Sequence, residues 1–522
     1  MKGKGMVYLV GAGPGDAGLM TMRGAELLAR ADVVVYDALV NSDLLRLAPA
    51  GAELIFAGKR SGLHVMPQED LNRLLIENAR AGKCVVRLKG GDPYVFGRGG
   101  EEAEELAAAG MPFEVVPGIS SGIAGPNYAG IPLTHRDHCS SFSVITGHED
   151  PSKEDVDVDW VQVAAAPGTK VVLMGVTRVG KIADALMANG MAATTPVAVI
   201  RWATTGRQQS VFGTLKTIAE AVESARFTPP GIIVIGEVVK LREKLNWFEK
   251  RSLFGRRIVV TRTREQASQL SRQLLERGAD VLEIPVIRTV PPTDRKSIAD
   301  VLLELNSYNW LIFTSPNGVA AFFEFFFKAF DDMRDIGGVR IAAVGAATAA
   351  KLQELHLKVD VMPDEYVASK IADALAKYES IENLKMLLLR AEVANKDLPK
   401  QLEKMGAIVD DAAVYKTVPE TDDRNGAAAR LMEGGADWIT FTSSSTVEHF
   451  NARFDLKQLA GRHPQLKLAS IGPETSKAIA ALGLEPAVEA KQHTIDGLVK
   501  AIESSSSHSI HSPEKGKHGY KC

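Results

Sequence analysis

The stretch VVRLKGGDPYVFGRGGEE, residues 85–102, decides the fold of the N-terminal half of this chain. It begins with an apolar run typical of a buried strand and ends in a glycine turn that opens a glutamate-rich helix. Asp92 precedes a proline, which restricts its backbone to extended or turn conformations. Gly90 and Gly91 let a ligand approach the main chain closely. We interpret the stretch as strand, ligand-binding turn and helix, and a purely structural tight turn is the alternative.

Three further turns of this kind follow predicted strands. They are GAGPGD at 11–16, PGISSGIAG at 117–125 and TGHED at 146–150. The first departs from the dinucleotide pattern G-x-G-x-x-G, because its third glycine falls one place early and Pro14 interrupts the turn. A nicotinamide site remains an alternative for this motif alone. His148, in the last turn, fits a structural role better than a catalytic one, which remains the alternative.

Composition and patterning indicate an α/β protein of several domains. Apolar runs alternate with Ala/Leu-rich segments that often stop at glycine, and 522 residues suggest three or four domains. A net charge of −3 gives no overall basic field for nucleic acid. The three cysteines have no CxxC spacing, and no apolar run is long enough to span a membrane. We therefore expect a cytoplasmic protein without a metal site, a nucleic-acid partner or a membrane partner.

An internal repeat marks the C-terminal half. RIVVTRTREQ from Arg257 is similar to KMLLLRAEVA from Lys385, and WLIFTSPNGV from Trp310 is similar to WITFTSSSTV from Trp438, each 128 positions later. IAAVGAATAA from Ile341 recurs after 127 positions as LASIGPETSK. Repeats at one offset predict two similar α/β lobes. We expect the boundary with the N-terminal half near residues 245–256, and a disordered tail over the Ser- and His-containing residues 504–522.

Over about 240 residues the chain resembles uroporphyrinogen-III C-methyltransferase. The resemblance rests on the glycine-rich blocks and on four further motifs that occur in the same order: YDALV, GKRSG, AGIPLTHR and GEVVKLREKLNWF. The resemblance implies a two-lobed tetrapyrrole-methylase fold over residues 1–248, divided near residue 120. It also implies S-adenosyl-L-methionine in the cleft between the lobes, and a homodimer formed through this half. Ser120 stands where the family more often has threonine, so the hydroxyl is kept.

The resemblance also implies which residues contact the cofactor. By motif these are Pro14, Gly90, Gly91, Asp92, Val95, Ser120, Ser121, Met174, Ala203 and Gly231. Without the resemblance, Met174 is better explained as a core residue that follows a strand.

Transfer of a sulfonium methyl group depends on in-line positioning, and the methylated ring then loses a proton that a carboxylate can accept. The resemblance suggests Asp37 as the proton acceptor and Lys59 as a proton donor, although each is also compatible with an exposed surface charge. The implied substrate, uroporphyrinogen III, carries eight carboxylates, which arginine binds well. We therefore expect substrate contacts from the cations near these motifs, which are Arg60, Arg98 and Arg136 together with Lys59, Arg87 and Lys89.

Turns rich in hydroxyls, glycine or proline recur between strands and helices in the C-terminal half, as in FTSPNG (313–318), FTSSSTVE (441–448) and IGPETS (471–476). Pro316 and Pro473 suit the first turn of a helix, and Ser445 has capping-box spacing to Glu448. Helix N-termini attract anions, so we interpret these turns as a polycarboxylate site, with ordinary helix capping as the alternative.

The order and duplication of these units resemble uroporphyrinogen-III synthase over residues 256–503. The resemblance implies an internally duplicated fold, with one lobe over 256–287 plus 418–503 and another over 290–414. It suggests that Tyr415 assists loss of hydroxyl from hydroxymethylbilane, although Tyr415 is equally a packed strand residue. Weaker candidates for substrate contact are Thr314, Ser315, Thr442, Ser443 and Thr475.

We therefore expect a bifunctional enzyme that cyclises hydroxymethylbilane to uroporphyrinogen III and methylates it twice to precorrin-2, on the route to sirohaem or cobalamin. One alternative keeps the methyltransferase but makes the C-terminal half a catalytically inactive tetrapyrrole-binding or sensory module. The others are a nicotinamide oxidoreductase and a methylase that acts on a later corrin intermediate.

Overall fold

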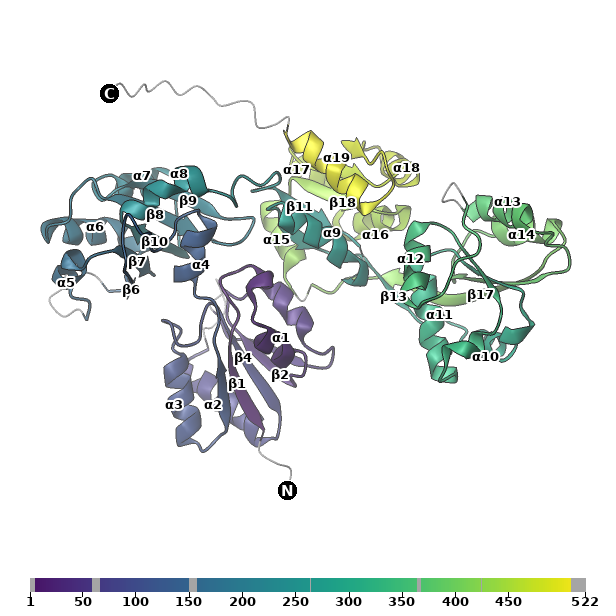
Figure 1. Ribbon diagram of the computed structural model, residues 1–522, viewed down its shortest axis with the longest axis horizontal. Coiled ribbons are helices and arrows are strands. Elements are labelled where there is room, and N and C mark those ends of the chain that lie inside the picture. The colour runs from purple at the N-terminus through teal and green to yellow at the C-terminus, as the bar shows by residue number, and fades with distance from the viewer. Residues whose placement is uncertain are drawn as a thin grey trace.

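The computed structural model describes residues 5–58, 66–149, 157–262, 264–363, 368–423 and 425–507, and these form four lobes that each contain a five-stranded sheet (Figure 1). The first and second lobes make up the N-terminal half. The third and fourth lobes make up the C-terminal half, and the third lies between the N-terminal half and the fourth lobe (Figure 1).

The first lobe is a parallel sheet in the order β3-β2-β4-β1-β5. Its strands are β1 (Met6–Gly11), β2 (Val33–Tyr36), β3 (Glu53–Phe56), β4 (Cys84–Lys89) and β5 (Phe113–Val116), and its helices are α1 (Met22–Leu28), α2 (Gln68–Arg80) and α3 (Gly99–Ala108). Leucines of α1 pack on one face of the sheet, and leucines of α2 and α3 pack on the other. This two-sided burial explains the continuous apolar runs in β1, β2 and β4. Because the strands are parallel, the loops that follow them meet at one edge.

The second lobe is a mixed sheet in the order β6-β7-β10-β8-β9. Its strands are β6 (Phe142–Thr146), β7 (Thr169–Leu173), β8 (Pro196–Arg201), β9 (Gln209–Thr214) and β10 (Gly231–Ile235), and its helices are α4 (Ser121–Tyr128), α5 (Trp160–Ala165), α6 (Val179–Ala188), α7 (Ile218–Ser224) and α8 (Arg242–Leu245). Apolar residues of α5, α6 and α7 form the core on one face, around Ile182 and Ile218. Helix α4 contacts β7 and β10.

The third lobe is built from two separate chain segments. Its sheet has the order β12-β11-β18-β19-β20, with β11 (Arg257–Val260), β12 (Asp280–Glu283), β18 (Trp438–Phe441), β19 (Lys467–Ser470) and β20 (Val488–Glu489). Its helices are α9 (Arg264–Glu276), α15 (Ala427–Gly434), α16 (Ser444–Phe454), α17 (Leu456–Arg462), α18 (Pro473–Ala481) and α19 (Ile495–Ser507). Helix α19 includes residues 504–507, so the expectation of a disordered tail from residue 504 is wrong there; residues 508–522 lie outside the described chain.

The fourth lobe repeats this arrangement. Its sheet has the order β13-β17-β16-β14-β15, with β13 (Ile287–Val290), β14 (Trp310–Phe313), β15 (Arg340–Ala343), β16 (Lys385–Ala391) and β17 (Ile408–Pro419). Its helices are α10 (Lys296–Leu303), α11 (Pro316–Ala329), α12 (Ala346–Glu354), α13 (Ala368–Tyr378) and α14 (Asp397–Lys404). Strands β13 and β17 pair antiparallel, with Ile287 opposite Pro419, and carry the chain between the third and fourth lobes (Figure 1).

The sequence repeat appears as matching strand orders in these two lobes. Strands β12, β11, β18 and β19 correspond to β17, β16, β14 and β15. Strand β11 pairs with β18, which comes from the other copy of the repeat, so each lobe combines parts of both copies. A polar contact repeats as well: Asp437 accepts the N–H of Arg257, and Asn309, which is 128 positions earlier, accepts the N–H of Lys385.

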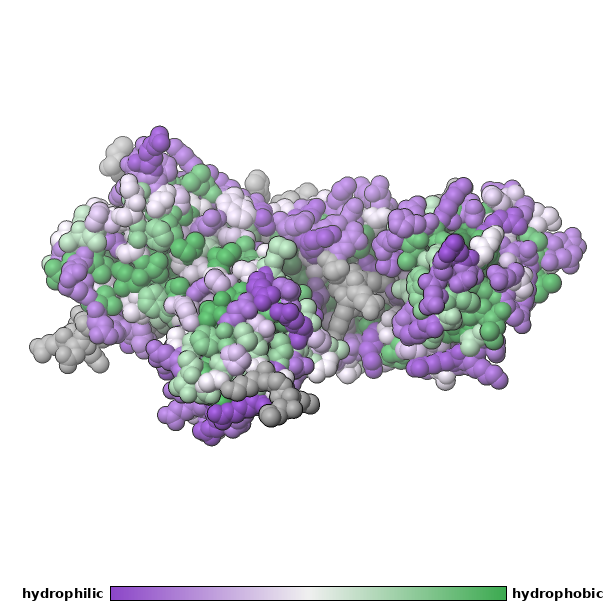
Figure 2. Space-filling model, turned by 60° about the horizontal axis from the view of Figure 1, so that its bottom comes forward, coloured by the Kyte–Doolittle hydropathy of each residue, from purple (hydrophilic) through white to green (hydrophobic). Residues whose placement is uncertain are grey.

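Surface character differs between the lobes. On the face drawn in Figure 2, hydrophobic residues gather over the second lobe, at the left, while hydrophilic residues follow the outer edges of the first and fourth lobes. Across the described ranges, no helix combines the length and apolar character needed to cross a membrane. Within the same ranges, no cluster of His, Cys, Asp and Glu side chains is arranged to hold a metal ion.

Candidate functional site

A cavity of about 870 Å³ lies between the first and second lobes and extends to the third lobe. It is lined by the loops at the carboxyl edge of the parallel sheet and by the loops after β7 and β8. All of the residues expected to contact the cofactor line this one cavity: Pro14, Gly90, Gly91, Asp92, Val95, Ser120, Ser121, Met174, Ala203 and Gly231. Asp37 lines it as well. The structure thus brings together residues that are spread over more than 200 positions of the chain.

Close backbone packing joins three of the glycine-rich loops. The main chain of Gly13 and Gly91 exchanges two hydrogen bonds, of 3.2 and 2.8 Å. A Cβ on Gly118 would lie 2.2 Å from the carbonyl oxygen of Gly91 and 2.7 Å from the Cα of Gly11. These positions admit no side chain without movement of the neighbouring backbone, so the glycines are required for the loops to meet.

The carboxylate of Asp92 fastens the same loops. Its two oxygens accept the backbone N–H groups of Tyr94 at 2.8 Å and of Gly118 at 3.0 Å. The sequence suggested that this carboxylate binds a ligand; in the structure it lines the cavity and also ties the loop after β4 to the loop after β5.

Asp16 connects the two lobes across the cavity. Its backbone N–H donates to Thr204 Oγ1 at 2.9 Å, and its carboxylate accepts the Tyr128 hydroxyl at 3.1 Å. Burial, reinforced by the charge of Asp16, raises the pKa of Tyr128 to about 12. Sequence reasoning missed Thr204 and Tyr128, because neither lies in a glycine block and their meeting with Asp16 depends on how the lobes pack.

The second lobe contributes backbone in unusual conformations. Met174, Trp202 and Thr204 have φ angles of 59°, 49° and 70°, in the left-handed region that non-glycine residues rarely adopt. Such residues concentrate at ligand sites, where the surrounding structure holds them in place. All three line the cavity, and the half-exposed side chain of Met174 excludes the alternative that it is a core residue.

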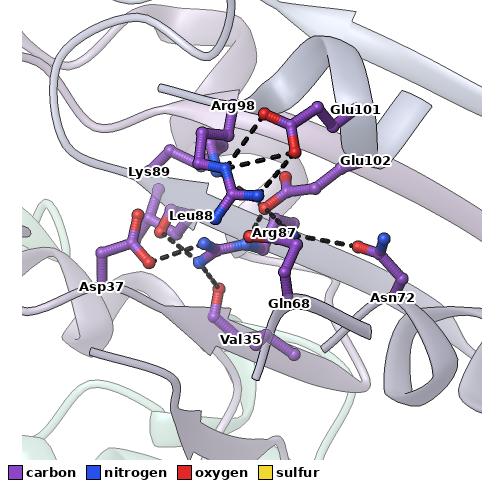
Figure 3. A network of polar contacts seen from close by, with 10 residues as sticks. All are labelled: Val35, Asp37, Gln68, Asn72, Arg87, Leu88, Lys89, Arg98, Glu101 and Glu102. Atoms are coloured by element: carbon purple, nitrogen blue, oxygen red, sulfur yellow. Dashed lines mark hydrogen bonds and ion pairs between the residues drawn. The ribbon is translucent and has the colours of Figure 1, made fainter. Parts of the chain in front are cut away.

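A buried network of charges supports Asp37 (Figure 3). Arg87 donates to Asp37 at 2.6 Å and to Glu102 at 3.1 Å, and Lys89 donates to the same Glu102 oxygen at 2.8 Å. Arg87, Lys89 and Glu102 are each no more than 3% exposed. The spacing of Arg87 and Lys89 on β4 turns both side chains toward α3, which carries Glu102.

This network corrects one expectation from the sequence. Arg87 and Lys89 were grouped with cations that face the substrate, but they are buried and neutralised by Glu102 and Asp37. Burial lowers the pKa of Lys89, and the nearby Arg87 charge lowers it further, while Glu102 opposes both effects. Arg87 therefore positions Asp37 at the cavity instead of contacting a ligand directly.

Four other cations were expected near the substrate. Lys59 and Arg60 fall outside the described residues. Arg98 pairs with Glu101 on the surface of α3 at 2.6 Å, and Arg136 is exposed; neither is among the residues that line the cavity. His148 is exposed as well.

In the C-terminal half, Tyr415 lies on β17 and is 9% exposed. Its hydroxyl is 3.1 Å from the Oγ of Ser315, the N-cap residue of helix α11 in the same lobe. Burial raises the pKa of the Tyr415 phenol, and the hydrogen bond with Ser315 partly offsets that effect. The structure thus brings together two of the residues expected to act in this half.

The remaining candidates in this half cap or pack against helices. Ser315 and Ser443 are N-cap residues of α11 and α16, and each accepts a backbone N–H from the first turn. Thr314 and Thr442 precede them and are partly buried, whereas Thr475 is buried within α18. Pro316 and Pro473 occupy the first helical turn as expected. The expected capping box of Ser445 with Glu448 is wrong, because the box is formed by Ser443 and Thr446.

Comparisons with known proteins match both halves. The family described as tetrapyrrole (corrin/porphyrin) methylases matches residues 6–219, and the family described as uroporphyrinogen-III synthase HemD matches residues 268–500. "Porphyrin biosynthesis protein HemD" of Ruminiclostridium josui is 37% identical over 95% of this chain and 97% of its own length.

The chain belongs to the family of fused tetrapyrrole methylases and uroporphyrinogen-III synthases. It is therefore a bifunctional protein of tetrapyrrole biosynthesis with a methyltransferase half and a synthase half, as the sequence predicted. Membership in this family supports the expected cofactor, S-adenosylmethionine.

Two further proteins are similar to parts of the chain. "Uroporphyrinogen-III C-methyltransferase" of Bacillus subtilis (strain 168) is 41% identical over 69% of this chain and 74% of its own length. A crystal structure of uroporphyrin III C-methyl transferase from Thermus thermophilus has 42% identity and a TM-score of 0.39, and covers 45% of this chain and 100% of its own.

Proposed function

We propose that the methyltransferase half transfers two methyl groups from S-adenosylmethionine to uroporphyrinogen III, giving precorrin-2, and that the synthase half makes uroporphyrinogen III from hydroxymethylbilane. The observation that carries the first activity is the single cavity that gathers every predicted cofactor residue together with Asp37. Its glycine-rich loops, built from close backbone contacts, suit a ligand that is recognised through main-chain groups.

S-adenosylmethionine supplies an electrophilic methyl group when it is bound. Pro14, Gly90, Gly91 and the loop before Ser120 hold it between the lobes, and the link from Asp16 to Thr204 keeps the two walls of the cavity together. Orientation of this kind is the main contribution that a protein makes to methyl transfer.

Asp37 accepts the proton that the methylated ring releases. The Arg87 guanidinium holds the carboxylate in place at the cavity, where the carboxylate acts as a base. Glu102 in turn balances the charges of Arg87 and Lys89 within the sheet. Arg87 is thus a positioning residue, and Asp37 is the group that meets the substrate.

In the synthase half, Tyr415 assists departure of the hydroxyl from hydroxymethylbilane. Its phenol proton is retained because burial raises the pKa, and Ser315 orients the hydroxyl group. The helix N-termini capped by Ser315 and Ser443 offer backbone N–H groups to substrate carboxylates.

Incubation of the whole protein with hydroxymethylbilane and S-adenosylmethionine, followed by mass spectrometry, tests both activities. A dimethylated type III macrocycle supports the proposal. Unmethylated type III macrocycle would refute the methyltransferase proposal, and the spontaneously formed type I isomer alone would refute the synthase proposal and favour a binding module.

We also propose that the chain forms a homodimer through its methyltransferase half. Large apolar side chains are exposed there, including Tyr94, Phe96, Ile119 and Phe142. Sedimentation equilibrium tests the proposal, and a monomer at micromolar concentration would refute it.

A further inference from the structure

The third lobe packs against the rim of the methyltransferase cavity. Arg46 forms an ion pair with Glu283, Ser42 Oγ donates to the carbonyl oxygen of Asn425 at 3.0 Å, and Arg207 Nε lies 3.8 Å from an Asp280 carboxylate oxygen. Leu275, Ala279, Asp280, Val281, Asn425, Gly426 and Arg430, all from the synthase half, line the same cavity as the predicted cofactor residues. The synthase half therefore provides one wall of that cavity.

The fit at this contact is close. Gly206 follows the left-handed residue Thr204 in the loop after β8, and a Cβ on Gly206 would lie 2.2 Å from the backbone nitrogen of Asp280 and 2.3 Å from the carbonyl carbon of Ala279. Backbone of the methyltransferase half thus touches backbone of the synthase half with no space for a side chain.

Guanidinium groups are in excess at this wall. Arg207 stacks on Trp202 with its guanidinium carbon 4.3 Å from the ring centroid, and its Nε and that of Arg201 have no hydrogen-bond partner within the described chain. Burial lowers the pKa of Arg207; Asp280 opposes this, while Arg430, Arg257 and Arg201 lower the pKa further. The Asp280 carboxylate that lies near Arg207 also pairs with Arg257, at 2.8 Å.

Arg430 is the member of this group that the synthase half presents to the cavity. It lies on α15, is partly buried and lines the cavity beside Asn425 and Gly426. Its guanidinium makes no hydrogen bond or ion pair with any residue that the structure describes. A cation that lines a cavity in this way is free to bind an anionic ligand there.

The charges of the two proposed ligands, S-adenosylmethionine and the tetrapyrrole, show which of them suits the arginine-rich wall of the cavity. S-adenosylmethionine carries a sulfonium and an ammonium beside its single carboxylate, so clustered guanidiniums repel most of its charge. A tetrapyrrole with acetate and propionate side chains is a polyanion, and carboxylates bind guanidinium through charge-assisted hydrogen bonds. We propose that the third lobe completes the methyltransferase site, with Arg430 and Arg207 together binding a carboxylate side chain of the tetrapyrrole substrate. This inference rests on the proposed methyltransferase function and deepens it.

The test uses the full-length chain and three variants of the synthase half: Arg430→Met, Arg430→Lys and the control Arg462→Met. Arg462 is an exposed arginine at the end of α17, in the same lobe but outside the cavity lining. The KM for uroporphyrinogen III and kcat are measured at saturating S-adenosylmethionine, and the Kd of S-adenosylhomocysteine is measured by calorimetry.

We expect Arg430→Met to raise the KM for uroporphyrinogen III about tenfold, which corresponds to loss of one charge-assisted hydrogen bond. Arg430→Lys restores much of the affinity, kcat and the Kd of S-adenosylhomocysteine stay unchanged, and Arg462→Met behaves as the wild type. If Arg430 had a purely structural role, Arg430→Met would lower the melting temperature and leave the KM for uroporphyrinogen III unchanged.

Three results would overturn the inference: an unchanged KM in Arg430→Met, an equal rise in Arg462→Met, or a weaker Kd for S-adenosylhomocysteine in place of the change in KM. The third result would assign the carboxylate to the methyl donor. A wild-type chain that makes no methylated product would instead refute the proposed function, so the two failures are distinguishable.

Discussion

At the end of β2, the Asp37 carboxylate accepts a hydrogen bond of 2.6 Å from a terminal nitrogen of the Arg87 guanidinium. The Nε of Arg87 donates to the buried carboxylate of Glu102. The position of Asp37 at a strand end was predictable from the sequence, because YDALV follows an apolar run. The contact with Glu102 was not predictable. In the sequence Glu102 is one of several glutamates of a helix, and only the packing of α3 on the sheet shows that it is buried.

The first prediction concerns Asp37 itself. Asp37→Asn keeps the shape of the side chain and removes its basicity, so we expect kcat for methyl transfer to fall by about 100-fold or more while the KM changes little. Initial rates of methylation with uroporphyrinogen III measure both constants. Asp184→Asn, an exposed change on α6 of the second lobe, is the matched control. Full activity in Asp37→Asn would show that another group takes the proton.

The second prediction concerns Tyr415. Its pKa is raised by burial, so the neutral phenol is favoured in the folded protein and persists through the ordinary pKa of 10.0. The contribution of this pKa shift to the free energy of unfolding is fully present below pH 10. It is lost as the pH rises through the raised pKa of the folded protein. We expect Tyr415→Phe to slow cyclisation about 10- to 100-fold and to leave methyl transfer unchanged.

The pH profile gives an independent check on Tyr415. Wild-type cyclisation should show no loss of rate attributable to this phenol between about pH 8 and pH 9.5. Unchanged synthase turnover in Tyr415→Phe would return Tyr415 to the role of a packed strand residue.

Among the elements, the glycine-rich loops after β1, β4 and β5 act as one unit, because each is in backbone contact with another. Gly118→Ala forces the new methyl group against the carbonyl oxygen of Gly91, and overpacking of this kind costs about 1–3 kcal/mol. We expect the affinity for S-adenosylhomocysteine, measured by calorimetry, to fall about tenfold or more. The control is Gly100→Ala at the start of α3, where nothing lies within 4 Å of the added Cβ. Equal affinity in the two variants would contradict the close-contact argument.

Strand positions were more predictable than helix ends. The 128-residue offset makes β11 the counterpart of β16 in the repeat, and β14 the counterpart of β18, because apolar strands buried on both faces leave a strong and repeated pattern. The capping box was misplaced by two residues, from Ser445 to Ser443, because FTSSSTVE offers three consecutive serines and only the packed helix selects one. The same offset did not reveal that β11 pairs with a strand from the other copy of the repeat.

At the scale of the whole molecule, the contact between the two halves could not be read from the sequence. Its members show no apolar periodicity: Arg46 lies in the short 3-10 helix Ser42–Leu47, and Gly206, Asp280 and Asn425 lie in loops or at a strand end. Each is an ordinary surface residue until the halves meet. Gly206 is the informative position among them. Its φ angle is not in the left-handed region, so backbone conformation does not require glycine there. The backbone of Ala279 and Asp280, which leaves no space for a Cβ, explains the glycine instead.

The contact between the halves yields the last prediction. Gly206→Ala places a Cβ within 2.4 Å of the synthase backbone, so the third lobe must move away from the cavity. We expect a larger radius of gyration by small-angle scattering and, because Arg430 moves with that lobe, a KM for uroporphyrinogen III raised by about the same factor as in Arg430→Met. Combining Gly206→Ala with Arg430→Met should add little, since both remove one contact. Gly461→Ala, in α17 of the same lobe with nothing within 4 Å of its Cβ, should leave both quantities unchanged. If Gly206→Ala enlarges the particle yet leaves the KM at the wild-type value, the synthase wall contributes nothing to substrate binding.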